Sequence, residues 1–178
     1  MTVILETPRL RLRHLVPTDL AFLADLLGDP EVMRYYPSVL DREGAAAWLD
    51  RQLQRYARDG YGGWLVERRS DGLAIGQVGA MRQQLAGDDE ASVEVGYLLH
   101  RSVWGCGYAT EAARATRDWI FTQLAVPRAI SLIRPENGRS RRVAERNGFV
   151  VTRQVLHAEL LHDVWGMERA VWLAGAAP

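Results

Sequence analysis

The chain has 178 residues, of which 48% are hydrophobic and 25% are charged, the balance of one ordinary globular domain with its own core. Its 22 basic and 22 acidic side chains cancel, so it lacks the long-range positive field that draws proteins to nucleic acid or anionic lipid. No apolar run reaches the roughly 20 residues of a membrane-spanning helix, and the first residues lack the pattern of a secretory signal. We therefore expect one domain over residues 1–178, located in the cytoplasm.

The N-terminal third predicts one strand and two helices. Residues 8–14 alternate leucine with arginine, the period of a strand with one buried face. Apolar residues then recur at helical spacing from Leu20 to about Gly28. A second helix is expected from about Asp41 to Ala57, with an apolar face of Ala45, Trp48, Leu49, Leu53 and Tyr56. We expect its other face to be solvated; that face carries Arg42, Arg51, Arg55 and Arg58.

The remaining two thirds predict strands mixed with helices. Three apolar runs punctuated by glycine, at 63–69, 73–81 and 91–99, indicate three antiparallel strands joined by hairpins. Helical stretches at 109–123 and 139–147 alternate with strands at 129–135 and 149–156, and a last strand is expected near 165–173. The pattern favours a mixed α/β (α+β) fold.

The most informative segment runs from Glu94 to Ala113, where a strand is followed by a glycine loop and the start of a helix. Gly105 and Gly107 allow a tight turn that brings backbone N–H groups close to a ligand, and the helix directs its positive end to the same point. Such a loop binds phosphate. Alternatively, the glycines make only a tight turn. A dinucleotide-binding fingerprint fails because residue 110 is Thr110, and no Gly-Lys-Ser/Thr phosphate loop occurs.

Two motifs carry a resemblance to a known family. The segment WGCGYATEA is similar to the acetyl-CoA loop of GNAT acetyltransferases, Gln/Arg-x-x-Gly-x-Gly/Ala, with Gly107 and Ala109 at the last two positions. Trp104 replaces the usual Gln or Arg. About 30 residues later, Asn137 and Ser140 resemble the family's Asn-x-x-Ser helix, which ends here in NGF at 147–149. The opening LETPRLRLRHLVPTDL resembles the branch that includes the ribosomal-protein N-terminal acetyltransferases.

The resemblance implies a fold and a cofactor site. It implies a mostly antiparallel sheet of about seven strands, splayed at the cofactor site and flanked by about four helices. Acetyl-CoA would be the co-substrate, with no metal, and its acetyl group would pass to a primary amine without a covalent enzyme intermediate. Its pantetheine arm would meet the backbone of Leu98, Leu99 and His100, and Asn137. Its pyrophosphate would meet the loop residues Trp104, Gly105, Cys106, Gly107, Tyr108, Ala109 and Thr110.

Two residues are candidates for the chemistry. Many relatives use a tyrosine as the acid that protonates the leaving thiolate, but that position is Ala144 here. Ser140 is the expected substitute, unless its hydroxyl only bonds backbone at the helix start. Glu94 interrupts an apolar alternation and is the candidate base for the amine. Because it lies more than about 10 Å along the strand from the expected thioester, proton transfer would pass through water. Alternatively, Glu94 forms an ion pair with a neighbouring arginine.

The acceptor is the open question. Tyr35, Tyr36 and Trp64 either line the acceptor cleft or belong to the core, and His162 borders the acceptor pocket if the family's layout holds. The four histidines lack metal-ligand spacing, and the thiol of Cys106 is expected to be incidental. A protein N-terminus, a small-molecule amine, a longer acyl-CoA donor and a non-catalytic CoA-binding module all remain open. An exposed C-terminal strand would favour a homodimer.

Overall fold

The computed structural model describes residues 2–175, which form an eight-stranded sheet and five α-helices. The sheet order is β1-β2-β3-β4-β5-β6-β8-β7. The strands are β1 (Val3–Glu6), β2 (Leu10–Arg13), β3 (Gly63–Arg68), β4 (Ala74–Gln83), β5 (Ser92–Leu99), β6 (Arg128–Ile133), β7 (Val150–His157) and β8 (Leu160–Glu168). The helices are α1 (Leu20–Gly28), α2 (Arg42–Asp59), α3 (Tyr108–Trp119), α4 (Gly138–Arg146) and α5 (Arg169–Gly175).

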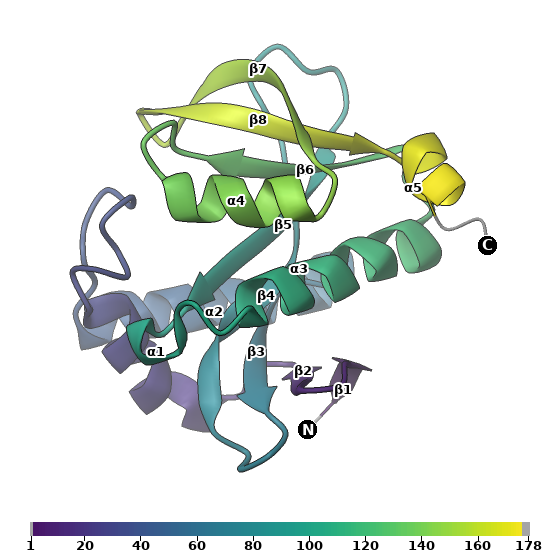
Figure 1. Ribbon diagram of the computed structural model, residues 1–178. Helices are drawn as coiled ribbons and strands as arrows, with labels where there is room; N and C mark the ends of the chain where they lie inside the picture. The colour runs from purple at the N-terminus through teal and green to yellow at the C-terminus, as the bar shows by residue number, and fades with distance from the viewer. Residues whose placement is uncertain (1, 176–178) are drawn as a thin grey trace.

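One strand pair sets the shape of the sheet. Every neighbouring pair is antiparallel except β5 and β6, which run parallel and pair only at Val93↔Ala129 and Glu94↔Ile130. On its other edge, β5 pairs with β4 over its whole length, from Ser92 to Leu99. Beyond Glu94 the two strands therefore diverge, and the sheet opens between β5 and β6 (Figure 1).

Helices cover both faces of the sheet, and each face has its own core. The strand alternation of β3 sends Trp64 and Val66 into the core under α3 and α4, and Leu65 into the core under α1 and α2. Figure 1 shows α3 and α4 lying together on one side of the sheet, with α1 and α2 on the opposite side. Within residues 2–175, no helix has both the length and the apolar character needed to cross a membrane.

The predicted elements are mostly confirmed, with two errors at the ends of the chain. The helices expected at 109–123 and 139–147 correspond to α3, extended by a π-helical turn over Ile120–Leu124, and to α4. The strand expected near 165–173 is wrong in its second half, because β8 ends at Glu168 and α5 follows. Strand β1 precedes the strand expected first.

The expected exposed C-terminal strand is also corrected by the topology. The last strand, β8, lies inside the sheet between β6 and β7, so both of its edges are paired. The exposed edge at this end of the sheet belongs to β7, whose Val150, Val151 and Leu156 are exposed.

Candidate active site

A cleft of about 1030 Å³ opens where β5 and β6 diverge. One half is lined by the loop that follows β5, by the first turn of α3 and by α4. The other half is lined by the α1–α2 connection, by α2 and by the β7–β8 hairpin. Strands β4, β5 and β6 form the floor between the two halves. The cleft therefore joins the predicted phosphate loop to the predicted acceptor side in a single space.

The backbone of β5 presents unpaired groups to this cleft. The N–H of His100 donates to the Ile75 carbonyl at 2.9 Å, so the backbone groups of His100 and Leu98 face β4. The carbonyl of Val95 accepts from the Ser131 hydroxyl on β6 at 2.9 Å, so odd-numbered residues face the other edge. Tyr97 consequently directs its N–H and C=O groups into the gap, and Leu99 its N–H group, where β6 no longer pairs with them.

The glycine loop delivers a helix N-terminus to the same gap. Gly105 and Gly107 both adopt φ of 81°, the left-handed conformation that favours glycine, and Gly107 is the N-cap of α3. The N–H groups of Tyr108, Ala109 and Thr110 lie in the first helical turn, where the helix supplies no acceptor. The Trp104 indole donates to the Leu99 carbonyl at 2.9 Å and thereby ties the loop to the end of β5.

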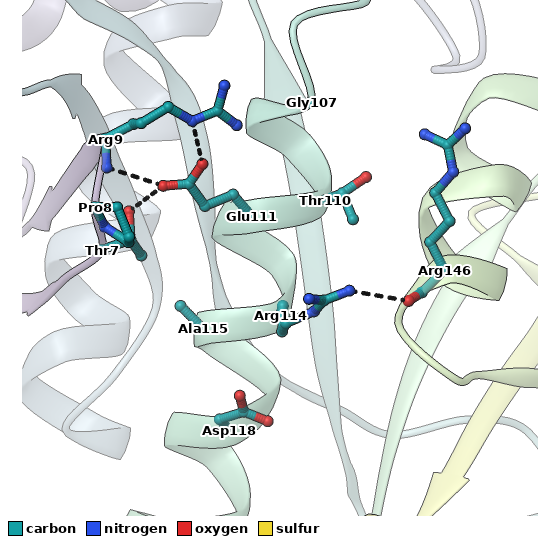
Figure 2. Close-up of a pocket in the computed structure, with 10 residues that line it drawn as sticks. All are labelled: Thr7, Pro8, Arg9, Gly107, Thr110, Glu111, Arg114, Ala115, Asp118 and Arg146. Atoms are coloured by element: carbon teal, nitrogen blue, oxygen red, sulfur yellow. Dashed lines mark hydrogen bonds and ion pairs between the residues drawn. The ribbon is translucent and has the colours of Figure 1, made fainter. Parts of the chain in front are cut away.

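A charged clamp on the opposite side of the loop fixes its position (Figure 2). Glu111, on α3, accepts hydrogen bonds from the Thr7 hydroxyl at 2.6 Å and from the backbone N–H of Arg9 at 3.0 Å. Its second oxygen pairs with Arg9 Nε at 2.6 Å. Arg9 Nη1 in turn donates to the carbonyl of Cys106 at 3.0 Å. Burial raises the pKa of Glu111, but the bonds from Thr7 and Arg9 outweigh it and lower the pKa below the usual value of 4.5.

Helix α4 brings polar groups to the cleft from the β6 side. Asn137 is its N-cap, with Oδ1 accepting from the Ser140 N–H at 3.1 Å, so the cap is Asn137 and not the Ser140 hydroxyl. The carbonyl of Ser140 accepts from the Tyr97 hydroxyl at 2.8 Å, a bond that spans the gap between β5 and α4. Arg139, Arg142 and Arg146, at helical spacing, also line the cleft.

Glu94 is a buried carboxylate in the floor of the cleft, with 8% of its surface exposed. Its oxygens accept from Gln83 Nε2 at 2.5 Å and from the Leu132 N–H at 3.3 Å. Among residues 2–175, no arginine lies within ion-pair distance of it. Burial raises the pKa of Glu94 above 4.5, although these two bonds and the nearby His157 and Arg55 oppose that rise. A carboxyl group with a raised pKa in a cleft is suited to exchanging a proton.

Sequence and structure comparisons identify the family. Residues 9–150 match the model described as "Acetyltransferase (GNAT) domain". The chain belongs to the GNAT acetyltransferase family. It is 36% identical over 152 residues to the uncharacterized protein YkkB of Bacillus subtilis (strain 168), covering 85% of this chain and 87% of that one.

Solved structures share the fold. An acetyltransferase from Agrobacterium tumefaciens str. C58 superimposes with a TM-score of 0.79 at 29% identity, covering 94% of this chain and 95% of that one. The aminoglycoside acetyltransferase AAC(6')-Ib, solved with ribostamycin and coenzyme A, has a TM-score of 0.75 at 20% identity, covering 94% and 98%. The expected GNAT fold is confirmed, and the protein is an acetyl-CoA-dependent N-acetyltransferase.

In this GNAT acetyltransferase, the residues expected to bind the cofactor mostly gather in the cleft. Lining residues among them are Leu98, Leu99, Trp104, Gly105, Gly107, Tyr108, Ala109, Thr110, Asn137 and Ser140. His100 lies outside, since its imidazole contacts Asp25 at 3.3 Å and Ser102 Oγ at 2.8 Å. Cys106 is exposed on the loop and does not line the cleft.

On the acceptor side of the enzyme, the aromatic residues divide between the two alternatives left open, and one expectation, the solvated face of α2, is wrong. Tyr35 and Tyr36 line the cleft, as does His162, whereas Trp64 is fully buried in the core. The face of α2 that was expected to be solvated is not wholly so. Arg51 and Arg55 line the cleft, and Arg55 is half-buried, because it follows Trp48 by seven residues and therefore lies on the same side of the helix.

Proposed function

We propose that this enzyme transfers the acetyl group of acetyl-CoA to a primary amine by direct attack within the cleft between β5 and β6. The observation that carries the proposal is the free edge of β5, which leads into the N-terminus of α3. An unpaired strand edge suits the amide-rich pantetheine arm, and a helix N-terminus with glycine at its cap suits a pyrophosphate. The acetyl group would then lie between Glu94 and Ser140.

The cofactor would be held mainly by backbone groups and arginines. Tyr97 supplies its N–H and C=O groups and Leu99 its N–H group to the pantetheine arm and the thioester carbonyl, in place of the Leu98 and His100 groups expected from sequence. The phosphates would meet the loop N–H groups and the three arginines of α4 that line the cleft. The three arginines are Arg139, Arg142 and Arg146. Because they form no ion pair within residues 2–175, they are available to an anionic ligand.

The reaction requires a neutral amine and a protonated leaving group. Glu94 accepts the proton of the ammonium ion through intervening water, and the amine nitrogen then attacks the thioester carbonyl carbon. The C–S bond breaks as the Ser140 hydroxyl gives its proton to the thiolate. The nitrogen still carries one proton more than the product amide, and it passes that proton to the Ser140 oxygen, which restores the hydroxyl. Tyr97 acts as a positioning residue, because its hydroxyl bond to the Ser140 carbonyl holds the first turn of α4 against β5.

Release of free thiol from acetyl-CoA tests this proposal. The purified protein is incubated with acetyl-CoA and a panel of peptides, amino acids, polyamines and aminoglycosides, and the thiol is followed with a chromogenic reagent. Acceptor-dependent release establishes the transfer and names the acceptor class. Replacing acetyl-CoA by a longer acyl-CoA tests the donor. A protein that binds acetyl-CoA and turns over no acceptor would instead be a CoA-binding module.

A further inference from the structure

Arginines outnumber carboxylates in the acceptor half of the cleft. Helix α2 contributes Arg51 and Arg55, one turn apart, and the segment after β6 contributes Arg134. In the described part of the chain, two acidic residues line this half: Glu31, at the α1–α2 connection, and the buried Glu94. The wall that faces the acceptor therefore carries an excess of positive charge, which opposes a polycationic substrate.

The two arginines of α2 lack an acidic partner. No carboxylate in residues 2–175 lies within 4.0 Å of Arg51 or Arg55. Arg55 Nη1 donates to Gln52 Oε1 at 3.2 Å, and Arg55 is among the residues that line the cleft. Burial lowers the pKa of Arg55, the expected effect of desolvating a guanidinium without a counter-ion.

Arg51 is exposed and lies against an aromatic side chain. Its guanidinium lies 5.4 Å from the centre of the Trp48 ring, within cation–π range. The Trp48 indole donates to Gln77 Oε1 at 2.8 Å, and its ring packs edge-on against Tyr36 at 6.1 Å. This contact with Trp48 favours conformations of Arg51 that keep its guanidinium at the cleft.

Arg134, on the facing wall, lacks a hydrogen-bond partner within residues 2–175 for one of its nitrogen atoms. Its Nε atom is buried and has no hydrogen-bond partner in the described chain. The carboxylate it approaches is that of Glu136, at 3.6 Å, and Glu136 is 64% exposed. A buried donor without an acceptor costs stability, and within the described chain this guanidinium also lacks a close carboxylate that would compensate its charge.

We propose that the natural acceptor is an amine that carries a carboxylate a few bonds from the reacting nitrogen, with the carboxylate bound by Arg51 and Arg55. This inference rests on the proposed function and specifies its substrate class. Arg55 lies close enough to Glu94 to influence its ionisation, so the two groups can address the carboxylate and the amine of one small substrate. A free amino acid and a peptide with an acidic residue near its N-terminus both offer this chemistry.

Matched acceptor pairs test the inference. The first pair is phenylalanine and phenylalaninamide, and the second is the dipeptide amides Ala-Glu and Ala-Gln. We expect kcat/KM to be at least about 10-fold higher for the acidic member of one pair, a ratio that corresponds to about 1.4 kcal/mol, because two guanidinium groups can bind its carboxylate. The first pair reports a free amino acid, and the second reports a peptide.

Variants then assign the preference to α2. Arg55→Gln and Arg51→Gln should abolish the preference through KM, and Arg55→Lys should keep part of it. Arg42→Gln, which removes the same charge from an exposed position of α2 outside the cleft, should keep all of it. Melting temperature and acetyl-CoA binding establish that each variant is folded.

Two outcomes would overturn the inference, and both can be distinguished from failure of the proposed function. Equal or better turnover of the amides, or of an aminoglycoside, removes the carboxylate requirement. A preference that survives in the Arg51→Gln/Arg55→Gln double variant removes the assignment to these residues. If no acceptor is acetylated and acetyl-CoA does not bind, the proposed function itself fails, and this inference with it.

Discussion

At the scale of single residues, Glu94 is both buried and part of the cleft. Burial favours the neutral carboxyl group, whereas accepting a proton in the cleft requires the ionised carboxylate. Glu94→Gln keeps a side chain of the same shape but cannot accept a proton. We expect kcat/KM to fall about 10²-fold. Because burial raises the pKa of Glu94, the acidic limb of the wild-type profile should lie above 4.5, and the variant should lose the part due to this group. Superimposable pH–rate profiles would show that Glu94 is not the base.

The Glu94→Gln substitution, which should lower activity, should raise stability as the pH increases. A carboxyl group whose pKa is raised on folding stabilises the protein below its unfolded pKa, and this stabilisation is lost as the pH rises through the folded pKa. The free energy of unfolding of Glu94→Gln, relative to wild type, should therefore increase from pH 4 to pH 8. Urea denaturation at several pH values measures this difference. Glu90→Gln, at an exposed position close in sequence, should show neither change.

Ser140 and Tyr97 make a second test at this scale. If the Ser140 hydroxyl protonates the thiolate, Ser140→Ala should lower kcat by about 10²-fold and leave the KM for acetyl-CoA nearly unchanged. Tyr97→Phe removes the bond to the Ser140 carbonyl and should lower kcat less, by about 10-fold, since it only positions α4. A kcat for Ser140→Ala equal to wild type would leave the hydroxyl without a role in the reaction.

Local pattern accounts for which single residues could be predicted. The roles of Gly105 and Gly107 could be predicted because a left-handed conformation depends on the local chain. Glu94 could be predicted as a site residue because it interrupts an apolar strand. Arg51 and Arg55 were assigned to solvent because the wall that faces them, β4 and β5, is distant in sequence. The seven-residue spacing of Arg55 from Trp48 nevertheless indicates that the two side chains lie on the same side of α2. The local sequence gives no sign of the role of Tyr97, since its partner Ser140 lies 43 residues away.

At the scale of elements, the clamp between the β1–β2 turn and α3 supports the cofactor loop. Glu111→Ala removes the acceptor for Thr7 and Arg9 and releases Arg9 from its fixed position beside Cys106. We expect the KM for acetyl-CoA to rise about 10-fold with a smaller change in kcat, because the loop N–H groups lose their fixed direction. Steady-state kinetics with acetyl-CoA as the varied substrate measures both.

The clamp also predicts a pH dependence of stability. Because the pKa of Glu111 is lowered on folding, its stabilising contribution is present above the unfolded value near 4.5 and is lost as the pH falls through the folded value. The variant should be less stable than wild type by about 1 kcal/mol at pH 7, since Arg9 is half exposed, and the difference should shrink below pH 4. A constant difference across this range would mean that the charge of Glu111 is unimportant.

Strong periodicity and clear turn signals explain which elements were predicted. The hairpin strands β3, β4 and β5 carry β-branched residues bounded by glycine turns, and α2 ends at Gly60 with φ of 80°. Helix α5 was misread as strand because Val171 and Trp172 favour strands by propensity. Its actual conformation depends on tertiary contacts: Trp172 stacks on Phe121 at 5.3 Å and donates to Asp118 at 2.7 Å.

At the scale of the whole molecule, the sheet formed by residues 2–175 has two halves, β1–β5 and β6–β8, whose facing strands pair at two register positions. A ligand that fills the gap should therefore couple the halves. Acetyl-CoA at 100 times its Kd stabilises the folded state by about 2.7 kcal/mol, which corresponds to a rise in Tm of roughly 5–10 °C for a domain of this size.

Hydrogen exchange distinguishes this coupling from general stabilisation. The amides of Tyr97 and Leu99 face the gap, so acetyl-CoA should slow their exchange well beyond the change seen elsewhere in β5. The amides of Leu98 and His100 already face β4 and should change only with global stability. ADP, which offers phosphates but no pantetheine arm, should raise the Tm less and leave Tyr97 and Leu99 unprotected. Equal protection of all four amides by acetyl-CoA, or the same pattern with ADP, would mean that the arm does not pair with β5. The phosphate loop would then be the sole point at which the cofactor engages the sheet.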